Sequence, residues 1–66
     1  MGGMSKSVES YHGKGVGQDV TVLIGPWAGQ KVHVLEIEIE SGARNGWFTV
    51  RLPDGSKGMF AGEELA

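Results

Sequence analysis

Apolar and polar residues alternate over short stretches after residue 16, and no stretch of ten residues keeps a helical period. A group of mostly β-branched residues predicts the first strand, which ends before Gly25-Pro26: Val20, Thr21, Val22 and Ile24. Residues 47–52 alternate in the same way, and residues 57–60 form a shorter segment of this kind. The pattern therefore predicts an all-β fold of four or five short strands.

The most informative alternation covers residues 31–40, because its apolar positions change face partway along. A regular strand would place two apolar residues on one face and three on the other, namely Val32 and Val34 against Leu35, Ile37 and Ile39. Such a strand does not present both sets to one core, so we expect a β-bulge or a sharp coil near Val34-Leu35. Small closed barrels use strongly bent strands of this type.

Turn signals separate the predicted strands. Gly25–Gly29 contains a proline that presets φ and glycines that adopt backbone angles forbidden to side chains. Asn45-Gly46 is a strong hairpin signal, and Pro53–Ser56 predicts another tight turn. The final segment, residues 61–65, predicts one turn of 3₁₀ helix anchored by Leu65.

Residues 1–16 differ in composition from the rest of the chain, with four glycines and three serines. Their apolar residues are Val8, Tyr11 and Val16, apart from the methionines, and these follow neither a helical nor a strand period. So little apolar surface does not repay the entropy of ordering the chain. We therefore expect a flexible N-terminal arm over residues 1–16 and one folded domain over residues 17–66.

The first predicted strand and turn resemble a KOW motif, the strand–loop–strand element of SH3-like barrels in ribosomal and transcription-elongation proteins. The matching positions are Val20, Val22, Gly25, Pro26, Gly29 and Val32. The segments from Phe48 to Gly55 and from Phe60 to Leu65 are similar to the closing strands and 3₁₀ turn of bacterial SH3-like barrels. Over residues 17–65 the resemblance implies a small SH3-like barrel of four to five strands with a C-terminal 3₁₀ turn.

The KOW resemblance also implies an RNA or ribonucleoprotein-binding module, although this chain departs from the motif. KOW elements commonly carry another glycine and a basic residue where this sequence has Gln30 to Val34. Three glutamates then follow at alternate positions, Glu36, Glu38 and Glu40, and their charges repel phosphate. These departures argue against RNA contact through that surface.

A more distant resemblance is to the plasmid-borne dihydrofolate reductases, which are SH3-like tetramers. Their active pore is lined by a Val-Gln-Ile-Tyr strand, and the similar segment in this chain is Lys57-Gly58-Met59-Phe60. The glutamine and the tyrosine hydroxyl are missing from it. A reductase formed at the pore of an oligomer is therefore the most distant of the three alternatives.

Size and charge narrow the classes of function. A chain of 66 residues buries only about 60% of the surface that its unfolded form exposes, so we expect it to self-associate as a homo-oligomer. Six basic and eight acidic residues give a net charge of −2, whereas nucleic-acid-binding domains usually carry a positive excess. The lack of cysteine is compatible with a cytoplasmic location, and neither a membrane-spanning run nor a targeting signal is visible.

Exposed aromatic and acidic residues are the candidates for a partner-binding surface. Trp27 is at the tip of a Gly-Pro loop, and Trp47 alternates with Phe48, so it points outwards if Phe48 fills the core. We expect the two tryptophans, with Phe60, to form much of a self-association or partner surface. Glu36, Glu38 and Glu40 line one strand face at a spacing of about 6.6 Å, either as a solvated face or as a docking stripe for a basic partner.

The alternative nucleic-acid site consists of the basic residues of the folded part: Lys31, Arg44, Arg51 and Lys57. An RNA-binding face requires that these residues converge beside Trp27 or Trp47, where bases stack. His12 and His33 have no second ligand at metal-binding spacing, and Ser41 and Ser56 lie in turns, so we expect no metal, cofactor or catalytic residue. The sequence favours a non-enzymatic module for protein–protein interaction or homo-oligomeric assembly.

Overall fold

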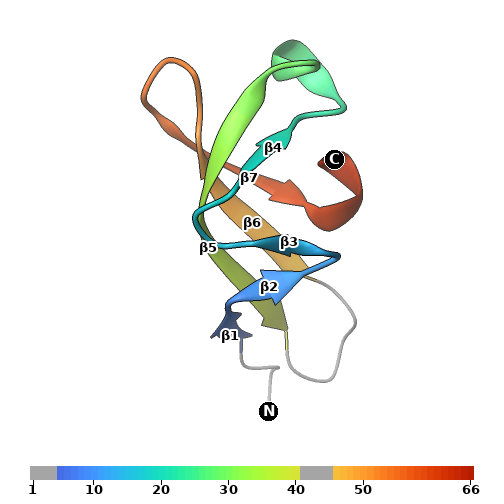
Figure 1. The fold of residues 1–66 in the computed structure, drawn as a ribbon, viewed down its shortest axis with the longest axis vertical. Helices are drawn as coiled ribbons and strands as arrows, with labels where there is room; N and C mark the ends of the chain where they lie inside the picture. The colour runs from blue at the N-terminus through green and yellow to red at the C-terminus, as the bar shows by residue number, and fades with distance from the viewer. Residues whose placement is uncertain (1–4, 41–45) are drawn as a thin grey trace.

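A computed structural model of the protein describes residues 5–40 and 46–66 (Figure 1). These residues form seven β-strands and two 3₁₀ turns. The strands are β1 Ser5–Val8, β2 Ser10–Tyr11, β3 Lys14–Gly15, β4 Asp19–Thr21, β5 Lys31–Glu40, β6 Gly46–Arg51 and β7 Lys57–Ala61. The 3₁₀ turns are η1 Gly25–Trp27 and η2 Gly62–Glu64. The all-β prediction is confirmed.

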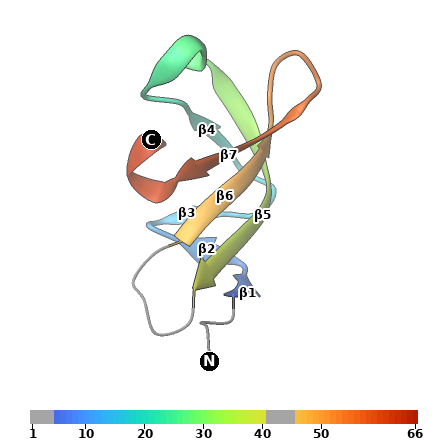
Figure 2. The ribbon, with the colours of Figure 1, turned by 180° about the vertical axis from the view of Figure 1, so that it is seen from behind.

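Five of the strands form one antiparallel sheet around the long strand β5. The sheet runs in the order β1-β5-β6-β7, and β4 also pairs with β5. β4 pairs with the start of β5, at Lys31 to His33, whereas β1 pairs with its end, at Ile37 to Glu40. Two short strands therefore share one edge of β5, and β6 occupies the other (Figure 2).

β5 contains the predicted bulge. Val34 pairs with Val50 and Glu36 pairs with Thr49, so Leu35 is an extra residue in the ladder. The bulge places Ile37 on the same side of the sheet as Val32 and Val34, and all three side chains are buried. β5 thus contributes to one core both before the bulge, through Val32 and Val34, and after it, through Ile37.

The core lies on the concave side of this sheet and consists of eight buried apolar residues: Val20, Val22, Val32, Val34, Ile37, Phe48, Val50 and Leu65. Phe48 and Val50 face it from β6 as the alternation predicts, and Leu52 packs against it half-buried. The turn at residues 53–56 is also confirmed, because the Leu52 N–H donates to the Ser56 carbonyl at 2.7 Å and Gly55 has φ of +90°.

The region after β4 meets the C-terminus. Val22 forms a bridge with Leu65, and Thr21 and Ala66 exchange two backbone hydrogen bonds of 2.9 and 2.8 Å. η2 turns the chain so that Leu65, which is 3% exposed, reaches the core as predicted. The observed strand β4 ends at Thr21, earlier than the predicted strand, which extended to Ile24. Leu23 and Ile24 follow the Val22 bridge and are about half exposed.

Residues 5–15 form three strands, where the sequence analysis expected part of a flexible arm. β1 pairs with the end of β5, and β2 and β3 form a hairpin across the open side of the sheet (Figure 1). The hairpin turns at His12 and Gly13, whose φ angles are +54° and +75°, the combination required by a type I′ turn. The side chains of Val8 and Tyr11 pack against the core, and this burial offsets the entropy of ordering the segment.

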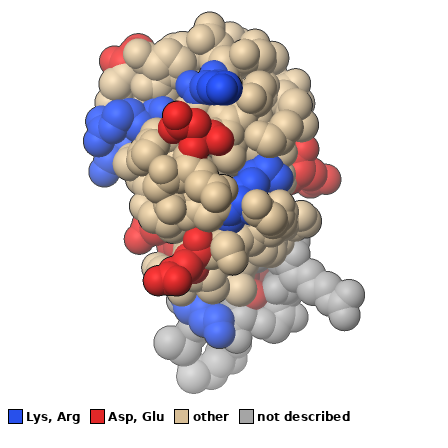
Figure 3. Space-filling model, in the orientation of Figure 1, with Lys and Arg blue, Asp and Glu red and all other residues tan. Residues whose placement is uncertain are grey.

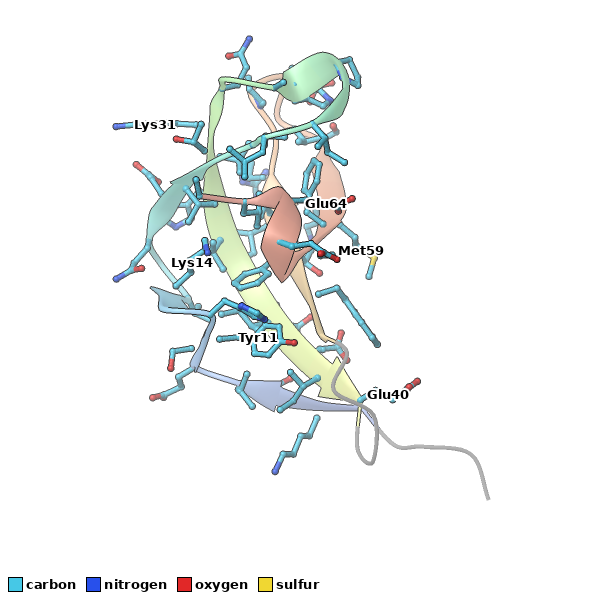
Figure 4. The ribbon with its side chains drawn as sticks, turned by 90° about the vertical axis from the view of Figure 1, so that its right-hand side faces the viewer. Tyr11, Lys14, Lys31, Glu40, Met59 and Glu64 are labelled. Atoms are coloured by element: carbon cyan, nitrogen blue, oxygen red, sulfur yellow. The ribbon has the colours of Figure 1, made fainter. Side chains whose placement is uncertain are left out.

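Tyr11 is the main contact of this hairpin with the sheet (Figure 4). Its ring lies 5.9 Å from the ring of Phe48, and His12 meets Tyr11 edge-on at 4.3 Å. Gly46 leaves room for Tyr11, since a Cβ there would lie 2.6 Å from the tyrosine ring. Gly62 leaves room for His12 in the same way, at 2.8 Å.

Candidate interaction surface

The β5 bulge determines which charges share the outer face of the sheet, the face of β5, β6 and β7 that points away from the core (Figure 2). Lys31 and His33 alternate with the buried Val32 and Val34 before the bulge. After it, the glutamates at 36, 38 and 40 alternate with Ile37 and Ile39. Because the bulge shifts the alternation by one residue, both sets lie on the outer face. This face therefore has opposite charges at its two ends.

One end of the outer face, here called the acidic half, consists of Glu36, Glu38, Glu40 and Trp47. Glu38 of β5 pairs with Trp47 of β6, and Trp47 pairs in turn with Ala61 of β7. The next row toward the other end is Glu36, Thr49 and Met59, where Met59 is 62% exposed. Trp47 is half-buried on the face opposite the fully buried Phe48. The predicted tryptophan and acidic stripe thus lie side by side.

The other end, here called the basic end, consists of Lys31, His33, Arg51 and Lys57. His33, Arg51 and Lys57 occupy one row across three strands, and Asp19 of β4 extends the row on the far side of His33. The carboxylate of Asp19 lies 2.9 Å from His33 Nδ1, and both side chains are largely exposed. Arg51 donates from Nη1 to the Gly55 carbonyl at 3.1 Å, which holds it toward the turn.

The structure separates Trp47 from the basic end. Trp47 and Arg51 lie on the same strand face four residues apart, a distance of about 13 Å. Lys31, Arg51 and Lys57, three of the four predicted basic residues, therefore lie at the basic end, and Trp47 is not beside them. The fourth, Arg44, lies outside the described residues.

The three predicted aromatic contacts do not form one surface. Trp27, in η1, is half-buried and packs against the core. Phe60 belongs to the core-facing row with Ile37 and Phe48, so it lies on the opposite side of the sheet from Trp47. Of the three, only Trp47 belongs to the outer face.

Charges of both signs are interspersed on the side of the molecule that carries the β2–β3 hairpin (Figure 3). In the described residues, no three histidine, aspartate or glutamate side chains lie together as metal ligands. Asp54, in the turn after β6, lies outside both ends of the outer face. Hydrogen bonds from the Ser56 hydroxyl at 2.6 Å and the Ser56 N–H at 2.9 Å lower the pKa of Asp54.

Within the same described ranges, no helix is long and apolar enough to cross a membrane. Comparisons of the chain with family models, curated proteins and solved structures return no match. The resemblances to KOW motifs and SH3-like barrels therefore stay predictions.

Sequence reasoning missed the contribution of Met59 and Thr49 to this face. The sequence shows that Thr49 points away from Phe48 and Val50. It does not show that Thr49 lies beside Met59, because that position depends on the pairing of β6 with β7. It also missed the Asp19 to His33 contact, since these residues are 14 positions apart and meet through the pairing of β4 with β5. Register, rather than composition, is the missing information in both cases.

Proposed function

We propose that this protein is a non-enzymatic binding module with an SH3-like barrel fold, which acts in protein–protein interaction or homo-oligomeric assembly. The observation that carries the proposal is the position of Trp47, half-exposed on the outer face between Glu38 and Ala61 and opposite the buried Phe48. Tryptophan is enriched among the residues that dominate binding energy at protein interfaces. Its placement outside a core this small supports a contact role.

The neighbours of Trp47 favour a partner segment with basic side chains. Glu38 is directly opposite Trp47, and Glu36 and Glu40 lie on the same face of β5 at a spacing of about 6.6 Å. Three carboxylates in a line repel one another in the free protein, and cations relieve that repulsion. A lysine- or arginine-rich segment therefore gains both an aromatic contact and charge neutralisation from the acidic half.

This proposal is tested with two panels of peptides of equal length, one rich in lysine and arginine and the other rich in glutamate. We expect the basic peptides to bind with higher affinity and to lose affinity as salt is added. Trp47→Ala should weaken this binding by about thirtyfold, the effect of a typical interface hot spot. Glu38→Gln should weaken it less, and Glu63→Gln, a charge removal on η2, serves as the control.

Equal binding of the acidic and basic panels would contradict the proposal. So would binding of the basic peptides that is unchanged by Trp47→Ala and Glu38→Gln together. Circular dichroism of each variant establishes that the sheet is retained.

The basic end favours a second candidate, a KOW-type RNA or ribonucleoprotein-binding module. Arg51 and Lys57 are directly opposed across β6 and β7, and His33 flanks Arg51. A single-stranded RNA of uniform sequence tests it: an affinity that falls steeply with salt and drops in Arg51→Gln and Lys57→Gln supports this candidate. The net charge of −2 and the distance of Trp47 from this end rank it second.

A further inference from the structure

β7 is an edge strand of the sheet, and its backbone pattern shows which of its groups face outward. Among the described strands it pairs with β6 alone. The Leu52 N–H donates to the Ser56 carbonyl, which makes Leu52 and Ser56 a hydrogen-bonded pair of this hairpin. Hydrogen-bonded pairs alternate with non-hydrogen-bonded pairs in an antiparallel ladder. Val50–Gly58 and Phe48–Phe60 are therefore the hydrogen-bonded pairs of β6 and β7.

It follows that Lys57, Met59 and Ala61 direct their backbone N–H and C=O groups away from β6. A second observation supports this orientation, because the Ala61 N–H donates to Glu64 Oε1 at 2.7 Å instead of to β6. Glu64 thereby closes the edge at Ala61. Lys57 and Met59 keep two donors and two acceptors on the outer edge of β7. Met59 is 62% exposed, and Figure 4 shows its side chain on the outside of the molecule.

We propose that two copies of the protein associate through this edge, with their β7 strands antiparallel and a two-fold axis between the two Gly58 residues. In this register Lys57 of each copy pairs with Met59 of the other. Each pair exchanges two N–H to O=C hydrogen bonds, so the four outward groups of Lys57 and Met59 on each copy are all used. A register centred on Met59 would instead pair Lys57 with Ala61, whose N–H already donates to Glu64. A register centred on Lys57 would pair Met59 with Gly55, whose N–H already donates to Leu52.

Side chains on both faces fit this arrangement. Gly58 has no side chain, so the two strands approach closely at the axis, where facing residues have Cα atoms about 4.5 Å apart. Lys57 lies diagonally across from Ala61 of the second copy, where the Glu64 carboxylate is held. A diagonal separation of about 7–8 Å is within the reach of a lysine side chain. Two symmetric Lys57 to Glu64 ion pairs therefore flank the backbone hydrogen bonds.

The occupant of the edge is a second copy because the edge is complementary to itself in both hydrogen bonding and charge. Strands of five residues form a small interface, so we expect a concentration-dependent dimer rather than an obligate one. The dimer deepens the self-assembly part of the proposed function and uses β7, whereas the acidic half stays available for another partner.

The experiment measures the sedimentation equilibrium of the full chain over a wide concentration range, together with its amide NMR spectrum. We expect a monomer–dimer equilibrium in which the amide signals of Lys57 and Met59 shift with concentration. The amides of Gly58 and Phe60, which already donate to β6, should shift much less. A monomer at every concentration, or concentration-dependent shifts confined to other strands, would overturn the proposal.

Substitutions then separate the backbone and charge contributions. Met59→Pro removes an outward donor and leaves the β6 pairing intact, since proline is tolerated where the N–H faces solvent on an edge strand. It removes two of the four hydrogen bonds and should weaken the dimer about tenfold, while Met59→Leu should not. Lys57→Glu, which places like charges near Glu64 of the second copy, should also weaken it.

If Met59→Pro fails to fold, Lys57→Glu tests the dimer in its place. Glu64→Gln is its partner variant, because the amide oxygen still accepts from Ala61 while the charge is lost. A dimer constant that none of these substitutions changes overturns the β7 pairing. Trp47→Ala separates the two proposals: it should weaken the binding of basic peptides about thirtyfold and leave the dimer constant unchanged.

Discussion

Val34 and Ile37 lie on the same side of β5 although they are three positions apart, an odd spacing that places residues on opposite faces of a regular strand. The extra residue Leu35 makes this possible. Val34 pairs with Val50 and Ile37 pairs with Phe48, so residues on both sides of the bulge contact the same face of β6 in a single core.

This relationship predicts unequal costs for two substitutions of similar size. Ile37→Ala should lower the free energy of unfolding by about 2–5 kcal/mol, because Ile37 is fully buried. Leu35→Ala should cost about 1 kcal/mol or less, since Leu35 is only half-buried and lies outside the core cluster. Urea unfolding of both variants measures the difference. Equal losses would show that the two side chains share one environment, as in a strand without a bulge.

The contact between Gly46 and Tyr11 predicts that the β2–β3 hairpin is sensitive to a single methyl group. A Cβ at position 46 would lie 2.6 Å from the Tyr11 ring and 2.7 Å from Ile39. Gly46→Ala should therefore destabilise the protein by about 1–3 kcal/mol and shift the NMR signals of the Tyr11 ring. Gly15→Ala is the matched control, because its nearest neighbour would lie at 3.4 Å. A smaller loss at position 46 than at position 15 would argue against the described packing of Tyr11.

The bridge between Val22 and Leu65 predicts that the C-terminus contributes to the stability of the whole sheet. Leu65 is 3% exposed, whereas Leu23 is 51% exposed, so the same substitution tests two environments. Leu65→Ala should cost about 2–5 kcal/mol and Leu23→Ala about 0.5 kcal/mol. Thermal unfolding followed by circular dichroism compares them. Equal unfolding temperatures for the two variants would show that the C-terminal residues do not stabilise the region after β4.

The Asp54 and Ser56 hydrogen bonds predict a dependence of stability on acid pH. The pKa of Asp54 is lower in the folded protein than in the unfolded chain, mainly because the Ser56 hydroxyl donates to the ionised carboxylate. The stabilisation is therefore complete above the unfolded pKa and is lost as the pH falls through the folded pKa. In Ser56→Ala the pKa should rise toward its ordinary value, and in Ser56→Thr it should stay low. An NMR titration of the Asp54 carboxyl carbon measures this; an unchanged titration in Ser56→Ala would exclude the hydroxyl as the main cause.

Much of the fold was predictable because its signals are local. The change of phase between Val34 and Leu35 predicts the bulge, because apolar residues on both faces of one strand have no other route into a single core. The turn at residues 53–56 is likewise specified by neighbouring residues, since its proline, aspartate and glycine restrict or bond their own backbone. In the 3₁₀ turn before Leu65, the Glu64 carboxylate accepts from the Ala61 N–H three positions earlier.

The N-terminal strands were not predictable in the same way. Ser5–Val8 has little apolar character of its own, and it is ordered by pairing with residues of β5 about 30 positions away. The β2–β3 hairpin has a local signal in His12-Gly13, since histidine and glycine both tolerate positive φ. Its stability, however, comes from the Tyr11 contact with Phe48 and from the absence of a side chain at Gly46.

The sequence by itself determined the class of the fold, the position of its main irregularity and the charged residues from which a surface could form. The tertiary structure decided which of those residues meet: it placed Trp47 beside Glu38, set Arg51 opposite Lys57, and put Phe60 on the core side. The reason is that alternation along a strand is a local property, whereas register between strands depends on hydrogen bonds and packing between distant segments.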